Sequence, residues 1–155
     1  MLTLAQRAIP TQIQRQIAAV NGLRLDFDVC DFVVPRSLVD VPLDRPEQLL
    51  LEPREDGGLD VSLVLDDGLL NAERGLSLDG FCAVAEGVSH LVYVVVACER
   101  EAQITALELE LQAEIDKFAL LVLALRIPAA RALQRLFTGF SWAADVDPEE
   151  QDRYR

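Results

Sequence analysis

The sequence predicts an α+β fold, in which a small antiparallel sheet of about three strands packs against a long helical hairpin with short flanking helices. Three observations indicate this fold. Segment 47–52 is short with an apolar centre, and segment 59–66 alternates between apolar and polar residues, as strands do. Segment 23–29 alternates between apolar and polar residues. Segments 79–99 and 105–126 are long, and their apolar residues recur at helical spacing.

The second long helix has the clearest start signal in the chain. Thr105 and Glu108 have the spacing of a capping box, in which each side chain bonds the backbone N–H of the other residue. We expect the helix to end near Arg126, because a proline at 128 disfavours the helical conformation just before it. Its apolar residues form one stripe, made of Leu107, Leu111, Phe118, Val122 and Leu125.

The first long helix is expected to begin at Asp79, as its N-cap, and to run to about Glu99. It is apolar nearly all round, which places it in the centre of the fold. The β-branched residues of segment 91–98 are also compatible with a buried strand. We favour a helix because residues 81–88 lead into this segment with no turn signal except Gly87.

Two capping signals open the chain, each a threonine followed three residues later by a glutamine. Thr3 predicts a first turn that stops before Pro10. Thr11 predicts the start of a second, amphipathic helix, and Asn21 with Gly22 should close it, since both tolerate the left-handed conformation.

The three predicted strands form an antiparallel sheet with one apolar face. Segment 23–29 should be a half-buried strand. Segments 47–52 and 59–66 should form a hairpin, because Asp56-Gly57-Gly58 between them accepts positive φ angles. The long helices are expected to cover the apolar face of this sheet, which three strands cannot bury alone.

Two shorter helices complete the expected fold. One covers residues 69–74, and the last covers 129–138, with Pro128 as its first residue and Gly139 as its cap. At 155 residues the chain is expected to form one α+β domain over residues 1–140, followed by an acidic C-terminal tail, 141–155.

The charge balance of 14 basic to 26 acidic residues gives a net charge of −12. Such a field repels phosphate backbones, so nucleic acid is not expected as a partner. The continuous apolar run 118–125 is far shorter than the roughly 20 residues that span a bilayer, so no membrane is expected either.

The three cysteines, Cys30, Cys82 and Cys98, are odd in number and have no Cys-x-x-Cys spacing. This argues against a disulfide scaffold or a zinc ribbon, and we expect all three to be small core residues. Free thiols, and an N-terminus without the basic start of a signal peptide, favour a cytoplasmic location.

One constellation could bind a divalent metal ion. Glu86 and His90 lie four residues apart on the first long helix, and Glu110 and Glu114 have the same spacing on the second. Antiparallel packing would bring these four side chains together, as in metal-binding helical bundles. In the structural alternative, Glu86 bonds His90 in a polar pocket, and Lys117 partly balances the charge of Glu114.

No catalytic motif supports an enzyme. The sequence contains no Gly-x-Ser-x-Gly nucleophile elbow, no phosphate-binding loop and no glycine pattern for dinucleotides. Its single histidine would have to serve any catalytic triad.

The leading interpretation is therefore a non-enzymatic, cytoplasmic protein–protein interaction module, an acidic adaptor, chaperone-like or regulatory protein, which forms a homodimer. Its partner surface is expected at Ile13, Ile17 and Val20, or around Trp142. This interpretation needs no cofactor. The alternative is a metal-binding protein or metal-dependent enzyme that uses the four residues named above. A third is a small-ligand sensor with a pocket between sheet and helices.

Overall fold

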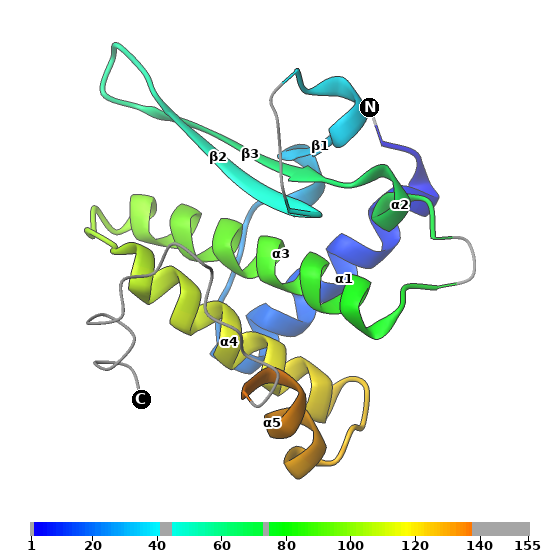
Figure 1. Cartoon of the computed structure of the whole chain (residues 1–155). Coiled ribbons are helices and arrows are strands. Elements are labelled where there is room, and N and C mark those ends of the chain that lie inside the picture. Colours follow the sequence, from blue (N-terminus) through cyan, green and yellow to red (C-terminus); the bar gives the residue numbers. More distant parts are fainter. Residues whose placement is uncertain (1, 41–44, 73–74, 138–155) are drawn as a thin grey trace, which may run out of the picture.

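A computed structural model describes residues 2–40, 45–72 and 75–137 (Figure 1). The elements are α1 (Leu4–Asn21), η1 (Val29–Asp31), β1 (Val33–Pro35), η2 (Arg36–Leu38), β2 (Glu47–Pro53), β3 (Leu59–Leu65), α2 (Asp67–Leu70), α3 (Leu78–Glu99), α4 (Ala106–Leu123) and α5 (Ala129–Phe137). The predicted α+β class is confirmed. The expected cap at Gly139 and the acidic tail 141–155 lie outside the described residues.

The sheet is mixed, so the prediction of a purely antiparallel sheet was wrong. Its order is β1-β3-β2, and the predicted hairpin of β2 and β3 is present, with Leu49 opposite Leu63. The third strand, β1, runs parallel to β3 and pairs Val33 with Leu63. Leu63 therefore has a neighbour on both sides, and it is fully buried.

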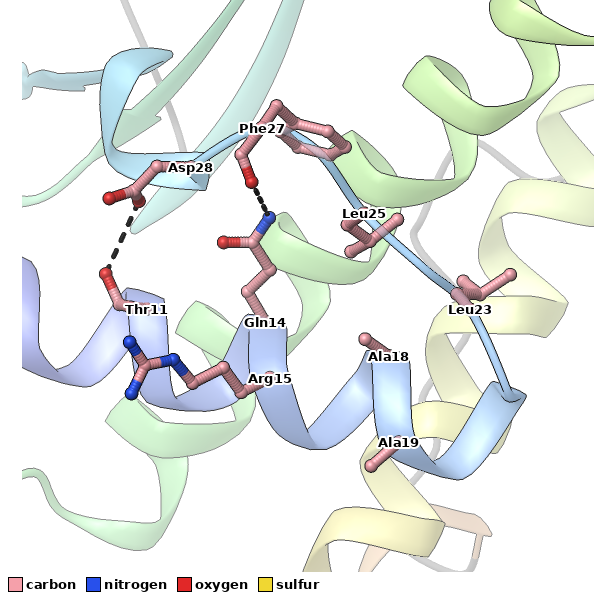
Figure 2. Close-up of a pocket in the computed structure, with 9 residues that line it drawn as sticks. All are labelled: Thr11, Gln14, Arg15, Ala18, Ala19, Leu23, Leu25, Phe27 and Asp28. Carbon is pink, nitrogen blue, oxygen red and sulfur yellow. Dashed lines mark hydrogen bonds between the residues drawn. The ribbon is translucent and has the colours of Figure 1, made fainter.

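The predicted strand over 23–29 is absent, and residues 23–28 instead follow α1 as an irregular segment (Figure 2). Its apolar residues are half-buried against the core, as their alternation predicted. Its backbone, however, bonds the Gln14 side chain, which donates to the carbonyl of Phe27 at 2.8 Å and accepts from the N–H of Val29 at 3.0 Å. The alternation therefore predicted the buried side of the segment correctly. It did not predict that a side chain, and not a neighbouring strand, would bond the backbone of this segment.

The N-terminal residues form one helix, α1, and the predicted break before Pro10 was wrong. The capping box at Thr3 is present and starts the helix, which continues through Pro10 to the left-handed cap at Gly22. Thr11 does not cap a helix, because α1 continues through it, and its hydroxyl donates to Asp28 at 3.4 Å. Pro10 itself is buried, so its packing offsets the helix hydrogen bond that a proline cannot make.

Helix α3 lies at the centre of the fold, between the sheet on one side and α4 on the other (Figure 1). Segment 91–98 is helical throughout, which excludes the strand alternative. The N-cap is Ser77 rather than the predicted Asp79, because the Ser77 hydroxyl accepts the N–H of Gly80. Within the described residues, α3 is the one helix long and apolar enough to cross a membrane, and it is largely buried, as a core helix of a folded domain would be.

Helices α4 and α5 form the outer layer. The capping box of Thr105 and Glu108 is present, as predicted. Helix α4 ends at Leu123, earlier than predicted, and Arg126 turns the chain with a φ of 58°. Helix α5 follows Pro128, whose carbonyl accepts its first backbone hydrogen bonds.

Two smaller predictions need correction. The short helix expected over 69–74 is α2, which begins at Asp67, because the Asp66 side chain caps it by accepting the N–H of Gly68. Of the three cysteines, only Cys30 is buried, while Cys82 is half-buried and Cys98 is exposed.

Replacing Gln14 with leucine should destabilise the protein by about 2–3 kcal/mol, since two backbone groups of the 23–29 segment would lose their partner. Urea denaturation of Gln14→Leu should show this loss. The matched control is Gln12→Leu, an exposed position on the same helix, which should change the free energy of unfolding by less than about 0.5 kcal/mol. Equal effects of the two substitutions would contradict a tethering role for Gln14.

Candidate functional site

The interface of α3 and α4 holds a buried lysine, Lys117, the single lysine of the chain. Its ammonium donates to Glu86 of α3 and to Glu114 of α4, each at 2.6 Å. Burial alone would lower the pKa of Lys117, but the hydrogen bonds to the two carboxylates outweigh it, so the pKa is raised above its usual value. Lys117 therefore stays charged and joins the two helices.

A second buried polar group, Asp116, lies beside it on α4 and is fully bonded. One of its carboxylate oxygens accepts the Ser89 hydroxyl of α3 at 2.6 Å. The other accepts the side-chain amides of Asn21, at the end of α1, and of Gln112. These bonds hold α1, α3 and α4 together, and they leave Asp116 no free oxygen for a ligand.

On the opposite side of α3, the sheet approaches the helix at Gly87. A Cβ atom on Gly87 would lie 2.7 Å from Cδ1 of Leu63 and 3.1 Å from Oε2 of Glu47. The absence of a side chain at Gly87 therefore lets the first residue of β2, Glu47, lie directly against the backbone of α3.

Glu47 is a buried carboxylate, with 6% of its surface exposed. Burial, first, and the nearby charge of Glu86, second, raise the pKa of Glu47 to about 7. Its Oε2 has no hydrogen-bond partner among the described protein groups. Glu47 is thus a carboxyl group that exchanges its proton near neutral pH.

His90 lies one turn after Glu86 on α3 and is also buried, with 8% of its surface exposed. Its Nε2 has no hydrogen-bond partner in the described part of the protein. Glu47 and His90 line one cavity of about 260 Å³ between β2, α3 and the start of α4. Glu110 and Arg45 supply its other charged groups.

The four predicted metal ligands do not form one cluster. Glu86 and Glu114 bond Lys117, whereas His90 and Glu110 line the cavity beside β2. In residues 2–40, 45–72 and 75–137, no three His, Cys, Asp or Glu side chains are placed to hold a metal ion. The role predicted for Lys117, as a counter-charge to Glu114, is confirmed.

A larger depression, of about 440 Å³, lies between α1 and the 23–28 segment (Figure 2). Two polar side chains of α1 that line it are already bonded within the protein, Gln14 to the carbonyl of Phe27 and Thr11 to Asp28. This depression is therefore the seam where the segment attaches to α1, and a weaker candidate than the cavity beside His90.

The outward face of α4 is apolar. Leu107, Leu111 and Ile115, spaced by four residues, expose 54%, 58% and 50% of their surface. The inward face of the same helix buries Asp116 and Lys117 beside Ala113, Leu120 and Leu121. Helix α4 thus differs from an ordinary surface helix in exposing an apolar row and in burying two charged side chains.

Three of the residues predicted to bind a partner lie in the described part of the chain, all on α1. Ile13 and Ile17 are core residues, each 1% exposed, so this fold leaves them no surface for a partner. Val20 is exposed near the end of α1. Trp142 lies outside the described residues.

Comparison with known proteins adds no relative. The chain matches no protein-family model, no curated protein and no solved structure at a significant level.

Sequence reasoning missed Glu47, because a glutamate at the start of a strand is normally solvated. It predicted Lys117 as a partial counter-charge to Glu114, but it did not predict that the lysine is buried and also bonds Glu86. A signal was present for Lys117, since this lone lysine stands directly before the apolar run that ends α4.

Replacing Lys117 with methionine should destabilise the protein by about 3 kcal/mol, because Glu86 and Glu114 would remain close together without a counter-charge. Adding Glu86→Gln and Glu114→Gln should recover most of this loss. Thermal and urea denaturation of the single and triple variants test this coupling. A triple variant less stable than Lys117→Met would contradict it.

Replacing Glu47 with glutamine should stabilise the protein at pH 8 by up to about 3 kcal/mol, since each pKa unit corresponds to about 1.4 kcal/mol. A raised pKa means that the folded protein holds the proton more tightly than the unfolded chain. The contribution of Glu47 to stability therefore falls as the pH rises from about 4.5 to about 7.

The measurement is the difference in unfolding free energy between the wild type and Glu47→Gln at pH 4.5, 6 and 8. The difference should grow with pH. Glu52→Gln, an exposed position on the same strand, should show no such trend. A difference that is constant with pH would contradict the burial of an ionisable Glu47.

Proposed function

We propose that this protein is a non-enzymatic protein–protein interaction module that associates through the outward face of α4. The exposed apolar row of this helix carries the proposal. A row of half-exposed leucine and isoleucine side chains is costly in water. A partner that covers the row would remove its apolar surface from water.

A second copy of the chain is the partner that fits this row best. With partly buried Phe118 and Val122, the row extends on both sides of Ile115. An antiparallel pair of α4 helices, related by a two-fold axis near Ile115, would therefore pack Leu111 against Phe118 and Leu107 against Val122 of the other copy.

The charges favour the same arrangement. The start of α4 carries the exposed carboxylates Glu108 and Glu110, whereas the region after α4 carries Arg126 and Arg131. Antiparallel packing would place the acidic end of each helix near the basic end of the other. Such complementarity selects orientation and partner more than it adds affinity.

We propose the same kinds of protein as the sequence predicts, namely an acidic adaptor, a chaperone-like protein or a regulatory protein of the cytoplasm. The net charge of −12 favours a protein partner over nucleic acid. The metal-dependent alternative has weaker support, because its four candidate ligands are divided between the lysine cluster and the cavity.

The test is the oligomeric state of a Leu111→Glu/Ile115→Glu variant by analytical ultracentrifugation. We expect the wild type to be a dimer and the variant to be a folded monomer, because two buried charges at the centre of an interface cost several kcal/mol. The control is Leu38→Glu, a strongly exposed leucine of η2, far from α4, which should remain dimeric.

A wild type that is monomeric at 100 µM, or a double variant that remains dimeric, would overturn this proposal. Circular dichroism of each variant distinguishes loss of association from loss of folding.

A further inference from the structure

Strand β2 forms one edge of the sheet, because the order β1-β3-β2 gives it a single neighbouring strand among the described residues (Figure 1). Two backbone hydrogen bonds show which side of β2 bonds β3. The N–H of Asp66 donates to the carbonyl of Pro46 at 2.8 Å, and the N–H of Arg54 donates to the carbonyl of Gly58 at 2.9 Å. In an antiparallel pair, such bonded residues alternate along the strand, so the even-numbered residues of β2 bond β3.

The odd-numbered residues of β2 therefore direct their backbone groups away from the sheet. In the middle of the strand these are Leu49 and Leu51, whose N–H and C=O groups have no hydrogen-bond partner among the described residues. Such a free edge is a template for a further strand. Pro53, the next outward residue, has no N–H to donate, so the free edge is short.

The cavity beside β2 lies along this free edge. Leu49 and Leu51 line it on the side of the strand, and Ala106 and Leu109 line it at the start of α4. Leu51 and Ala106 are exposed, whereas Leu49 and Leu109 are half-buried, so the cavity opens to solvent. In a strand added to β2, every second side chain would point to the same face as Leu49 and Leu51 and fill this apolar space. An open strand edge beside an apolar wall suits an extended peptide.

The charges near the cavity favour a basic peptide. Glu110 lines the cavity and Glu52 lies on β2, and both carboxylates are exposed. Arg45 is the one cationic side chain of the lining, while Arg54 at the end of the strand already bonds two nearby aspartates. The net charge of −12 acts in the same direction. Lysine or arginine next to the apolar residues of a peptide would thus be attracted, and acidic residues would be repelled.

We propose that β2 binds an extended, basic peptide of a partner protein as an added strand of the sheet. The peptide would bond the backbone of Leu49 and Leu51, and its apolar side chains would enter the cavity beside α4. A single strand fits this edge better than a second copy of the chain, because a second copy would bring its own α4 to the same place. The site is separate from Leu107, Leu111 and Ile115, so it does not depend on the proposed association.

The experiment is fluorescence anisotropy of the full chain at physiological salt with the labelled peptide Lys-Val-Thr-Val-Thr-Val-Lys, blocked at both ends. We expect saturable 1:1 binding, because the alternating valines give the peptide one apolar face. A peptide with glutamate in place of both lysines should bind at least fivefold more weakly.

Methylation of the peptide backbone tests the added strand directly. In a paired strand, the N–H groups of one alternate set of residues face β2, and those of the other set face solvent. Two N-methyl groups in the first set should therefore weaken binding at least tenfold, whereas two in the second set should leave the affinity nearly unchanged. Equal affinities of the two methylated peptides would overturn the proposal.

Ala106→Trp should also weaken binding at least tenfold, because the larger side chain fills the cavity, and it is expected to fold because Ala106 is exposed. The matched control is Ala130→Trp, an exposed alanine of α5, which should bind as the wild type does. The Leu111→Glu/Ile115→Glu variant should bind the peptide normally, so failure of this proposal is distinguishable from failure of the proposed association.

Absence of peptide binding, or unchanged binding by Ala106→Trp, would overturn the proposal. If a second copy occupies this edge instead, the peptide should not bind, and Leu51→Pro, which removes an outward N–H, should convert the protein to monomers. That result would overturn the proposal as well.

Discussion

The ammonium of Lys117 is the interaction on which the arrangement of the helices depends. Glu86 on α3 and Glu114 on α4 both bond it at 2.6 Å, so the lysine fixes how α4 is rotated about its own axis. Asp116 and Ser89 reinforce the same rotation from the next position. Because these polar side chains face α3, Leu107, Leu111 and Ile115 face away from it, whereas Leu120 and Leu121 nearer the end of the helix are buried. The exposed apolar row is thus a consequence of the buried ion cluster.

On the side of α3 that faces the sheet, the arrangement depends instead on close contact between the helix and the strands. Gly87 allows β2 and β3 to approach the helix, and Glu47 is buried by this approach. Glu47 and His90 line the same cavity, whereas Lys117 bonds Glu86 and Glu114. One helix therefore separates the ion cluster of Lys117 from Glu47 Oε2 and His90 Nε2, two buried atoms without a partner among the described groups.

Local signals in the sequence predicted the local structure well. The capping boxes of Thr3 and Thr105 and the turn at Gly57 are present, because each depends on a few neighbouring residues. Long-range pairing could not be derived in the same way. The alternation in 23–29 indicates which side is buried, yet the side chain of Gln14 takes the place of a neighbouring strand. For the site, helical spacing placed Glu86 and Glu114 correctly on facing helices, but it could not show that a lysine would separate them.

The carboxylates beside the apolar row of α4 also affect how molecules behave before they meet. Glu108 and Glu110 interrupt the leucines along the first turns of the helix, and both are exposed. At an ionic strength of 0.1 M, like charges repel each other over a distance of about 10 Å, which is wider than the contact range of a leucine. Charged residues that flank an apolar segment in this way act as gatekeepers against disordered aggregation. The acidic surface thus keeps an exposed apolar helix compatible with a concentrated protein solution.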